Sequence, residues 1–273
     1  MRFLIGIDGG GTKTDFVLCD TAGRVISRVR KNGSNLNNIG FEKAIGIVKE
    51  GINELLKNRE KSGLLSLFAG FSGGTTGDNR ELIHKELLRI IGDKAKVSNH
   101  SDAMSALTAG LEDKNGCVVI SGTGSIGYGR KDGKIIQVGG YGYLLDRGGS
   151  GYDLGRDALY HALCHKDGRG KATLMTELIE KVTGNLIKAL DDIYRKGKSY
   201  IASFAPVVFE AYRMGDDAAY EVVDNNACEL SKIFNALGAF LGDGNCGAVL
   251  SGSVFKEFDI IKKHLKPRLD YEF

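Results

Sequence analysis

The chain has 273 residues, which is long enough for one large domain or two ordinary ones. Its 42% hydrophobic and 26% charged residues are typical of a soluble globular protein, and its net charge of +3 is too small to indicate a dedicated nucleic-acid-binding protein. The first apolar run is too short for a signal peptide, and no window reaches the roughly 18 apolar residues of a membrane span.

The first half of the chain is predicted to form three short strands, followed by helices that alternate with strands. The opening strands, at 3–8, 15–20 and 24–30, are indicated by continuous or alternating apolar residues. Beyond them, helical spacing of apolar residues predicts helices at 41–58, 79–91 and 101–111, with strands between them at 64–71 and 95–99.

The opening pattern then begins again in the second half. Residues 117–140 read as a strand, a glycine-rich loop, a strand, an Asp-Gly turn and a strand. A long helical stretch at 150–241, a strand at 246–253 and a helix at 254–265 follow. The last segment, 267–273, reads as a strand, so a closing helix of this half would be expected beyond it.

This internal repeat predicts a duplicated α/β fold. We place the N-terminal domain at 1–112 and the C-terminal domain, with its helical insertion, at 113–273. Duplicated domains commonly bind a ligand in a cleft between them, and this arrangement is the expectation here.

The arrangement of the five cysteines argues against a disulfide-bonded protein and against a zinc-binding one. They are scattered along the chain, and none is spaced as Cys-x-x-Cys. A disulfide framework or a zinc site needs paired or clustered cysteines, so neither is expected. The pattern favours the cytoplasm as the location, and neither a membrane nor a nucleic acid is an expected partner.

The loop between the first two strands, GGGTKT at 9–14, differs from two familiar phosphate-binding motifs. In the Walker pattern a lysine would stand where this chain has Thr12. In the dinucleotide fingerprint a glycine would replace Thr14, and a helix would follow instead of a strand. The loop is therefore predicted to be a hairpin.

A glycine-rich hairpin can still bind phosphate, because successive amides form a concave anion site. Here Thr12 and Thr14 would add hydroxyl groups, Lys13 would add positive charge, and Asp8 would hold a magnesium ion. The alternative is a simple solvated hairpin. The similar loop SGTGS at 121–125 favours the phosphate interpretation, because two such loops could clamp one polyphosphate.

Four segments together resemble the N-acetylglucosamine kinase family, which is the BadF/BadG/BcrA/BcrD-type ATPase branch of the sugar kinase, heat-shock chaperone and actin superfamily. The segments are GIDGGGTKTDFVLCD at 6–20, SGTGS at 121–125, GGYGYLLDRGGSGYDLGRDAL at 139–159 and VLSGSVFK at 249–256. The resemblance covers nearly the whole chain. It implies two ribonuclease H-like domains, an actin-like ATPase fold, that close on ATP and Mg²⁺.

The resemblance also implies which residues bind the nucleotide. The two loops would bind its phosphates, and the segment near the C-terminus would lie beside the adenosine. The nucleotide-binding residues implied in this way are Gly10, Gly11, Thr12, Lys13, Gly122, Thr123, Gly124, Gly252 and Ser253, with Asp8 at the metal.

Asp102 lies where a predicted strand passes into a predicted helix. From the residues alone, a helix cap is the simpler interpretation. The resemblance instead places the family's catalytic aspartate at this position. Asp102 would then be the general base that orients the sugar hydroxyl and takes its proton. The neighbouring His100 is interpreted as a structural side chain.

The resemblance further implies an acceptor pocket of amides and hydroxyls that suits an N-acetylated sugar. Its implied residues are Asn35, Ser72, Gly73, Thr123, Gly140, Tyr141, Asp146, Arg147 and Ser150. The sequence departs from the family at Asp146-Arg147-Gly148, where the family has Gly-Asp-Glu. Either Asp146 reaches the sugar from a shifted loop, or Arg147 binds an anionic group such as the lactyl carboxylate of N-acetylmuramic acid, or Arg147 pairs with a nearby acid.

The function that the resemblance implies is an ATP-dependent kinase of N-acetylglucosamine, N-acetylmuramic acid or both, in cell-wall sugar recycling, acting as a homodimer. An alternative is an actin-fold ATPase that activates a CoA-ester dehydratase or reductase. Those relatives carry clustered cysteines for an iron–sulfur cluster, and the scattered cysteines disfavour this alternative. A third class is a chaperone-like or regulatory protein that binds nucleotide without phosphorylating a sugar.

Overall fold

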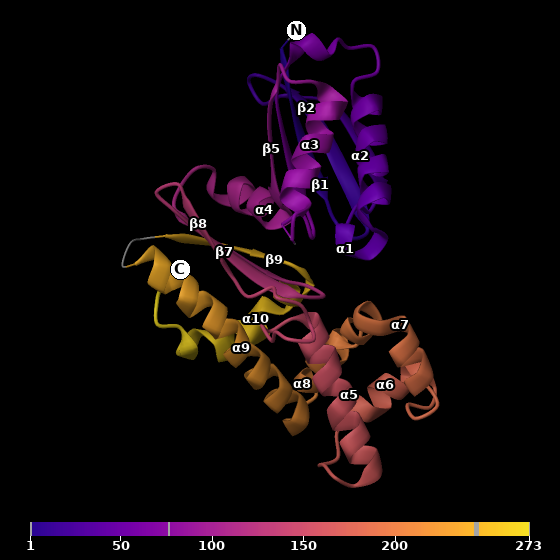
Figure 1. Cartoon of the computed structure of the whole chain (residues 1–273). Coiled ribbons are helices and arrows are strands. Elements are labelled where there is room, and N and C mark those ends of the chain that lie inside the picture. Colours follow the sequence, from indigo (N-terminus) through magenta and orange to yellow (C-terminus); the bar gives the residue numbers. More distant parts are fainter. Residues whose placement is uncertain (1, 76, 243–245, 273) are drawn as a thin grey trace. The chain divides into compact units, whose positions relative to one another are not determined.

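The computed structural model describes residues 2–75, 77–242 and 246–272 (Figure 1). The chain divides into two compact units, residues 1–109 and residues 110–273. The division falls near the end of a helix, a few residues before the boundary placed from the sequence. Each unit has its own sheet and its own hydrophobic core, and each is described below by itself.

The first unit is built on a five-stranded sheet with the strand order β3-β2-β1-β4-β5. The first three strands form an antiparallel meander, whereas β4 and β5 run parallel to β1. The strands are β1 Phe3–Gly9, β2 Lys13–Asp20, β3 Val25–Asn32, β4 Leu64–Phe71 and β5 Lys96–Ser101, and the helices are α1 Leu36–Ile39, α2 Phe41–Leu55, α3 Asn79–Ile91, α4 Asp102–Leu111 and the short 3₁₀ turn η1 Lys61–Gly63.

Alternation along the strands explains the core of the first unit. In β1 the buried residues Phe3, Ile5 and Ile7 alternate with more exposed ones, as a strand with one covered face requires. They share a hydrophobic cluster with apolar side chains of α2 and α3. Helix α2 approaches the sheet closely at Gly51, where a Cβ atom would overlap the ring of Phe16.

The second unit is built on a four-stranded sheet with the order β8-β7-β6-β9. Strands β6, β7 and β8 form a second antiparallel meander, and β9 is parallel to β6. The strands are β6 Gly116–Ser121, β7 Ser125–Lys131, β8 Lys134–Val138 and β9 Gly247–Ser251, and the helices are α5 Gly151–Asp167, α6 Leu174–Thr183, α7 Leu190–Ala202, α8 Ala205–Arg213, α9 Asp217–Leu241 and α10 Phe258–Leu265, with 3₁₀ turns η2 Ser253–Glu257 and η3 Lys266–Arg268.

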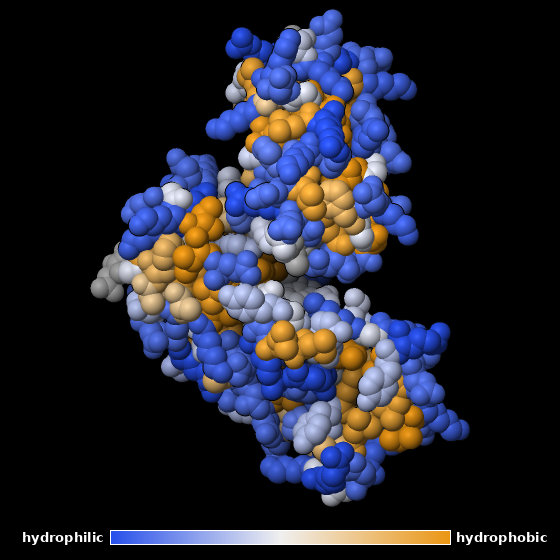
Figure 2. Space-filling model, in the orientation of Figure 1, coloured by the Kyte–Doolittle hydropathy of each residue, from blue (hydrophilic) through white to orange (hydrophobic). Residues whose placement is uncertain are grey.

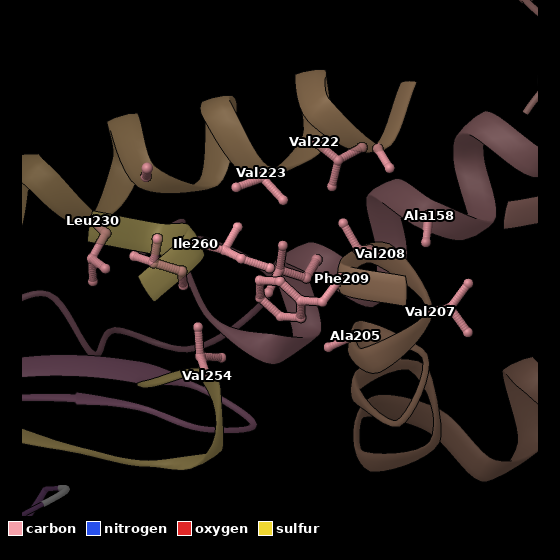
Figure 3. Close-up of a cluster of buried hydrophobic side chains, with 14 of the residues drawn as sticks. Ala158, Ala205, Val207, Val208, Phe209, Val222, Val223, Leu230, Val254 and Ile260 are labelled. Atoms are coloured by element: carbon pink, nitrogen blue, oxygen red, sulfur yellow. The ribbon is translucent and has the colours of Figure 1, made fainter. Parts of the chain in front are cut away.

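The core of the second unit lies between helices and sheet. Figure 3 shows Val222 and Val223 of α9 facing Phe209 of α8, with Ile260 of α10 in the same cluster. On the face drawn in Figure 2, hydrophobic residues form separate patches within a mostly hydrophilic surface. No helix among the described residues combines the length and apolarity needed to cross a membrane.

The structure confirms the internal repeat, because both units contain a meander with a glycine-rich first turn and a later strand parallel to its first strand. The predicted helical stretch at 150–241 divides into α5 to α9. The prediction of a strand at 267–273 is wrong. Pro267 instead lies in the turn η3, and residues 269–272 have no strand pairing; Phe273 lies outside the described residues.

The physical reason for that error lies in two contacts of the C-terminal segment. Arg268 donates hydrogen bonds to both carboxylate oxygens of Asp224 in α9, each at 2.9 Å. The ring of Tyr271 packs against α9 at Gly238, where a Cβ atom would overlap it. The segment therefore binds a helix through side chains, although its alternating pattern suggested a sheet.

Candidate functional site

The first glycine-rich loop, residues 10–12, joins β1 to β2. Gly10 donates its amide to Lys13 O at 2.9 Å and accepts a bond from Ser34 N at 3.0 Å. The chain passes so close at Gly33 that a Cβ atom there would overlap Gly11 O. Within the described residues, the amides of Gly11 and Thr12 have no hydrogen-bond partner, so both can bind an anion.

The side chains of this loop only partly match the prediction. Thr14 is fully buried, and its Oγ1 lies 2.8 Å from both Asn32 O and Ser34 Oγ. The hydroxyl therefore joins β2 to the end of β3 and is not exposed to a ligand. Lys13 forms an ion pair with Asp15 at 2.9 Å, while its side chain is 54% exposed.

Two carboxylates lie side by side at the start of this loop. Asp8 on β1 is opposite Asp15 on β2 in the strand register. Burial, and then the negative charge of Asp15, raise the pKa of Asp8, whereas Lys13 lowers it. Hydrogen bonds from Arg30 and Lys13 lower the pKa of Asp15. Sequence reasoning missed Asp15, although it belongs to the quoted motif.

Both carboxylates line a cavity of about 280 Å³ that also touches α4. In its wall lies the Ser105 Oγ atom, which is buried and has no hydrogen-bond partner in the described parts of the chain. No group of three or more His, Cys, Asp or Glu side chains in those parts could hold a metal ion. A cation here would therefore take most ligands from water or phosphate, which is how Mg²⁺ commonly binds.

The predicted sugar residues of the first unit form one hydrogen-bonded chain. Asn35 caps α1 by accepting from Asn37 N at 2.9 Å, and its Nδ2 donates to Ser72 Oγ at 2.9 Å. Ser72 also donates its amide to Gly9 O at 2.8 Å, and its side chain lowers the pKa of Asp102. Gly73 has a φ of 77° beside the Asn37 side chain, a conformation that favours glycine.

Asp102 is the first residue of α4 and follows directly on β5. Its Oδ1 accepts from Ala103 N at 3.0 Å, which is not the bond to the second or third amide that defines an N-cap. Burial raises the pKa of Asp102 most, and the negative charge of Asp8 adds to this effect. Hydrogen bonds from Ala103 N and Ser72 oppose the shift. The carboxyl is thus held close to a second acid with its proton affinity increased.

His100, by contrast, is turned toward its own backbone. Its Nδ1 accepts from Ser101 N at 2.8 Å, and burial lowers the pKa of the imidazole, with Arg80 adding to this effect. This geometry agrees with a structural interpretation of His100.

The second glycine-rich loop, residues 122–124, joins β6 to β7 in the second unit and rests on the first turn of α5. Gly151 N donates to Gly122 O at 2.7 Å, and Tyr152 N donates to Thr123 O at 3.3 Å. The amides of Thr123 and Gly124 have no hydrogen-bond partner in the described chain. Like the first loop, this loop presents two adjacent amides to an anion.

The third predicted nucleotide segment lies beside the second loop. Gly252 has a φ of 104° and packs so closely on β6 that a Cβ atom would overlap Ser121 O. Ser253 begins the turn η2. The structure therefore brings Gly252 and Ser253 to the base of the loop at 122–124, although more than a hundred residues separate them in sequence.

The side chains of segment 139–150 are mostly bound within the chain. Asp146 Oδ2 accepts from Tyr141 N at 3.1 Å, and Arg147 pairs with Asp157 Oδ2 at 2.6 Å. Ser150 is the N-cap of α5 in a capping box, so its hydroxyl is already occupied. Tyr141 is 69% exposed. Of the alternatives for Arg147, the structure shows the pairing with a nearby acid.

Within this segment, Gly140 packs closely against Ile126 of β7. It has a φ of 80°, and a Cβ atom there would approach Ile126 Cβ at 3.0 Å. Glycine is therefore required for the chain to turn at this point while packed on β7. All predicted residues fall into two groups, one in each unit.

The two units share a meander with a glycine-rich first turn, and the first unit adds Asp8 and Asp102 at the ends of its parallel strands β1 and β5. This repeated core defines the ribonuclease H-like class of α/β folds, to which actin-like ATPases and sugar kinases belong. The sequence profile of the BadF/BadG/BcrA/BcrD ATPase family matches residues 5–269, and the chain belongs to this family.

Relatives with assigned names support the same placement. The chain is 31% identical over 287 residues to the N-acetylmuramic acid/N-acetylglucosamine kinase of Clostridium acetobutylicum, covering 100% of this chain and 92% of that protein. It is 32% identical over 258 residues to the N-acetyl-D-glucosamine kinase of Dictyostelium discoideum, covering 88% of this chain and 81% of that protein.

Solved structures confirm the fold class. A Chromobacterium violaceum protein, an N-acetylglucosamine kinase by provisional assignment, superimposes with a TM-score of 0.80 at 25% identity, covering 99% of this chain and 94% of that one. A ROK family glucokinase from Streptomyces griseus, solved with glucose and AMPPNP, gives 0.58 at 17% identity, covering 98% and 90%. The second likeness bears on the fold alone.

Proposed function

We propose that this chain is an ATP-dependent kinase that phosphorylates a hydroxyl of an N-acetylated amino sugar, either N-acetylglucosamine, N-acetylmuramic acid or both. The observation that carries the proposal is Asp102, a half-buried carboxyl with a raised pKa beside the hydrogen-bonded pair Asn35 and Ser72. The names of the relatives indicate the same reaction.

Asp102 would act as the general base. A base in phosphoryl transfer orients the attacking hydroxyl and receives its proton, and it works best when its pKa lies closer to the working pH than that of a free aspartate. Burial supplies this change for Asp102. Asn35 and Ser72 would bind sugar hydroxyls beside it, and their mutual hydrogen bond fixes both before the sugar arrives.

The two glycine-rich loops would bind the phosphates of ATP through their free amides. Gly11 and Thr12 supply these amides in one unit, and Thr123 and Gly124 supply them in the other. Lys13 would add charge beside the first loop, and Gly252 with Ser253 would lie beside the adenosine.

Asp8 would hold Mg²⁺, whose charge offsets that of the phosphates when it is bound. The fit rests on the two adjacent carboxylates of Asp8 and Asp15, because repulsion between them is relieved by a cation. Asp15 already has Lys13 and Arg30 as partners, which leaves Asp8 as the carboxylate for the ion.

The contacts within the second unit indicate which of its predicted residues are available to bind the sugar. Tyr141 and the backbone at Gly140 remain accessible, and Thr123 is exposed. Asp146, Arg147 and Ser150 would have to exchange their present partners for sugar groups. We therefore place the main sugar contacts on Asn35, Ser72, Gly73 and Asp102 of the first unit, with Tyr141 as a second-unit contact.

The alternative of an activator for a CoA-ester dehydratase has no support. The relatives named above are called sugar kinases. All five cysteines are free thiols, and the described chain has no cluster that could hold a metal. Free thiols fit the cytoplasm that we propose as the location, and a homodimer is the proposed assembly.

The test is a coupled ADP-release assay over a panel of sugars, run with the native chain, Asp102→Asn and the exposed control Asp93→Asn. We expect turnover of N-acetylglucosamine or N-acetylmuramic acid, a loss of about 10²- to 10⁴-fold in Asp102→Asn, and no loss in the control. A native chain that turns over no amino sugar, or an Asp102→Asn variant that keeps full activity, would refute the proposal.

A further inference from the structure

One cation of the second unit has no assigned role. Helix α7 carries Arg195, Lys196 and Lys198 within one turn. Arg195 and Lys196 both pair with Asp192 on the same helix. No carboxylate of the described chain lies within ion-pair distance of Lys198, and the side chain is half-buried rather than solvated.

The backbone of α7 breaks just before this residue. Gly197 has a φ of 65° and a ψ of −150°, values outside the helical region, so the helix is interrupted there and resumes in a new direction. A φ in this range favours glycine. Lys198 therefore lies after the break, whereas its paired neighbours Arg195 and Lys196 lie before it.

The ammonium of Lys198 lies at the second glycine-rich loop. A Cβ atom added to Gly124 would be 3.3 Å from Lys198 Nζ, so the ammonium already lies at contact distance from this part of the loop. The same Nζ lies 5.4 Å from the centre of the Tyr143 ring, within reach of a cation–π interaction.

Burial lowers the pKa of Lys198, and the negative charge of Asp153 opposes the shift. Asp153 does not neutralise the ammonium directly. Its Oδ2 accepts from Ser150 Oγ at 2.8 Å, and its Oδ1 lies nearest to Arg156, at 3.6 Å. A partly desolvated cation is therefore present without a counter-charge of its own, a situation that an anionic ligand improves.

We propose that Lys198 binds a phosphate oxygen of the nucleotide, together with the free amides of Thr123 and Gly124. This inference rests on the proposed function, because it takes ATP as the ligand of the second loop. A cation beside two adjacent unpaired amides of one loop can bind an anionic oxygen. The carboxylate of an acidic amino sugar has the same chemistry, and the experiment separates the two sources.

The first measurement is the calorimetric titration of AMPPNP with Mg²⁺, without sugar, into the native chain, Lys198→Met and Lys198→Arg. We expect Lys198→Met to weaken the affinity about 10- to 100-fold, the usual effect of losing a hydrogen bond to a charged group. Lys198→Arg should recover part of it. Adenosine, which has no phosphate, should bind equally to all variants.

Lys196→Met is the matched control, because it removes a lysine from the same helix that is paired with Asp192. It should leave the affinity unchanged. Melting temperatures of all variants verify that they fold. An AMPPNP affinity that is unchanged in a folded Lys198→Met variant would overturn the inference, while kinase activity of the native chain would leave the proposed function intact.

The second measurement compares kcat/KM for N-acetylglucosamine and N-acetylmuramic acid. A nucleotide contact predicts the same fold-loss in Lys198→Met with both sugars, because both use the same ATP. A loss confined to N-acetylmuramic acid would assign Lys198 to the lactyl carboxylate and overturn the phosphate contact. A native chain that binds AMPPNP but phosphorylates neither sugar would refute only the proposed function.

Discussion

Among single residues, Asp102 has a pKa that is raised by its burial and by the negative charge of Asp8. Both effects favour the protonated form, so the pKa in the folded chain lies above that in the unfolded chain. Between the two pKa values the folded state binds more protons, and stability falls as the pH rises through this window. An ionised Asp102 at neutral pH is therefore a destabilising residue.

Asp102→Asn should consequently raise the melting temperature at pH 7, even though we expect the same change to remove the proposed activity. The gain should vanish near pH 3, where the carboxyl is protonated in both states and resembles the amide. Thermal unfolding at the two pH values, with exposed Asp93→Asn as the control, provides the measurement. A variant that is less stable than the native chain at pH 7 would contradict the assigned pKa direction.

The sequence could predict where residues lie when their position depends on a motif, such as the loop glycines between β1 and β2 and Asp102 at the junction of β5 and α4. It could not predict which polar side chains are already bound within the chain. Thr14 and Ser150 look like free hydroxyls in the sequence, but the structure uses one to join two strands and the other to cap α5. Lys198 was missed because a lysine in a helical stretch is usually solvated.

At the scale of elements, the contact between α5 and α7 depends on one glycine. A Cβ atom at Gly155 would overlap Ile201 O, which belongs to the backbone of α7 and cannot rotate away. Gly46 of α2 offers a matched comparison, because it is also inside a helix but has no atom within 4 Å of an added Cβ.

Gly155→Ala should therefore destabilise the chain by about 1–3 kcal/mol through overpacking. Gly46→Ala should stabilise it by about 0.5–1 kcal/mol, because alanine has the higher helix propensity. Chemical denaturation of the two variants measures both changes. Equal effects in the two positions would show that α7 accommodates the methyl group by moving freely.

Elements were predictable where one pattern persists over several residues. Both meanders could be read from short apolar strands and glycine-rich turns. The helical stretch at 150–241 could not be divided, because ends such as the break at Gly197 depend on a single backbone conformation. The C-terminal segment was misread because alternation in 267–273 reflects packing of Tyr271 on α9.

For the whole molecule, two separate cores imply that unfolding can proceed in two transitions. A ligand that binds only folded chain raises the free energy of unfolding by about 2.7 kcal/mol when present at 100 times its Kd. If each unit supplies one phosphate loop, AMPPNP with Mg²⁺ should raise every transition that calorimetry resolves. A rise in only one would confine the nucleotide to that unit's loop.

The hydrogen bond from Gly151 N to Gly122 O, and the contact of Gly155 with Ile201 O, both run through backbone atoms. These backbone contacts join the loop at 122–124 to helix α5, and helix α5 to helix α7, in addition to the packing of their buried side chains. During evolution, exposed side chains on these helices could therefore be exchanged without disturbing the backbone contacts that hold Lys198 at the loop. Gly155 and Gly197 could not, so changes at these two positions should be accompanied by loss or relocation of the lysine.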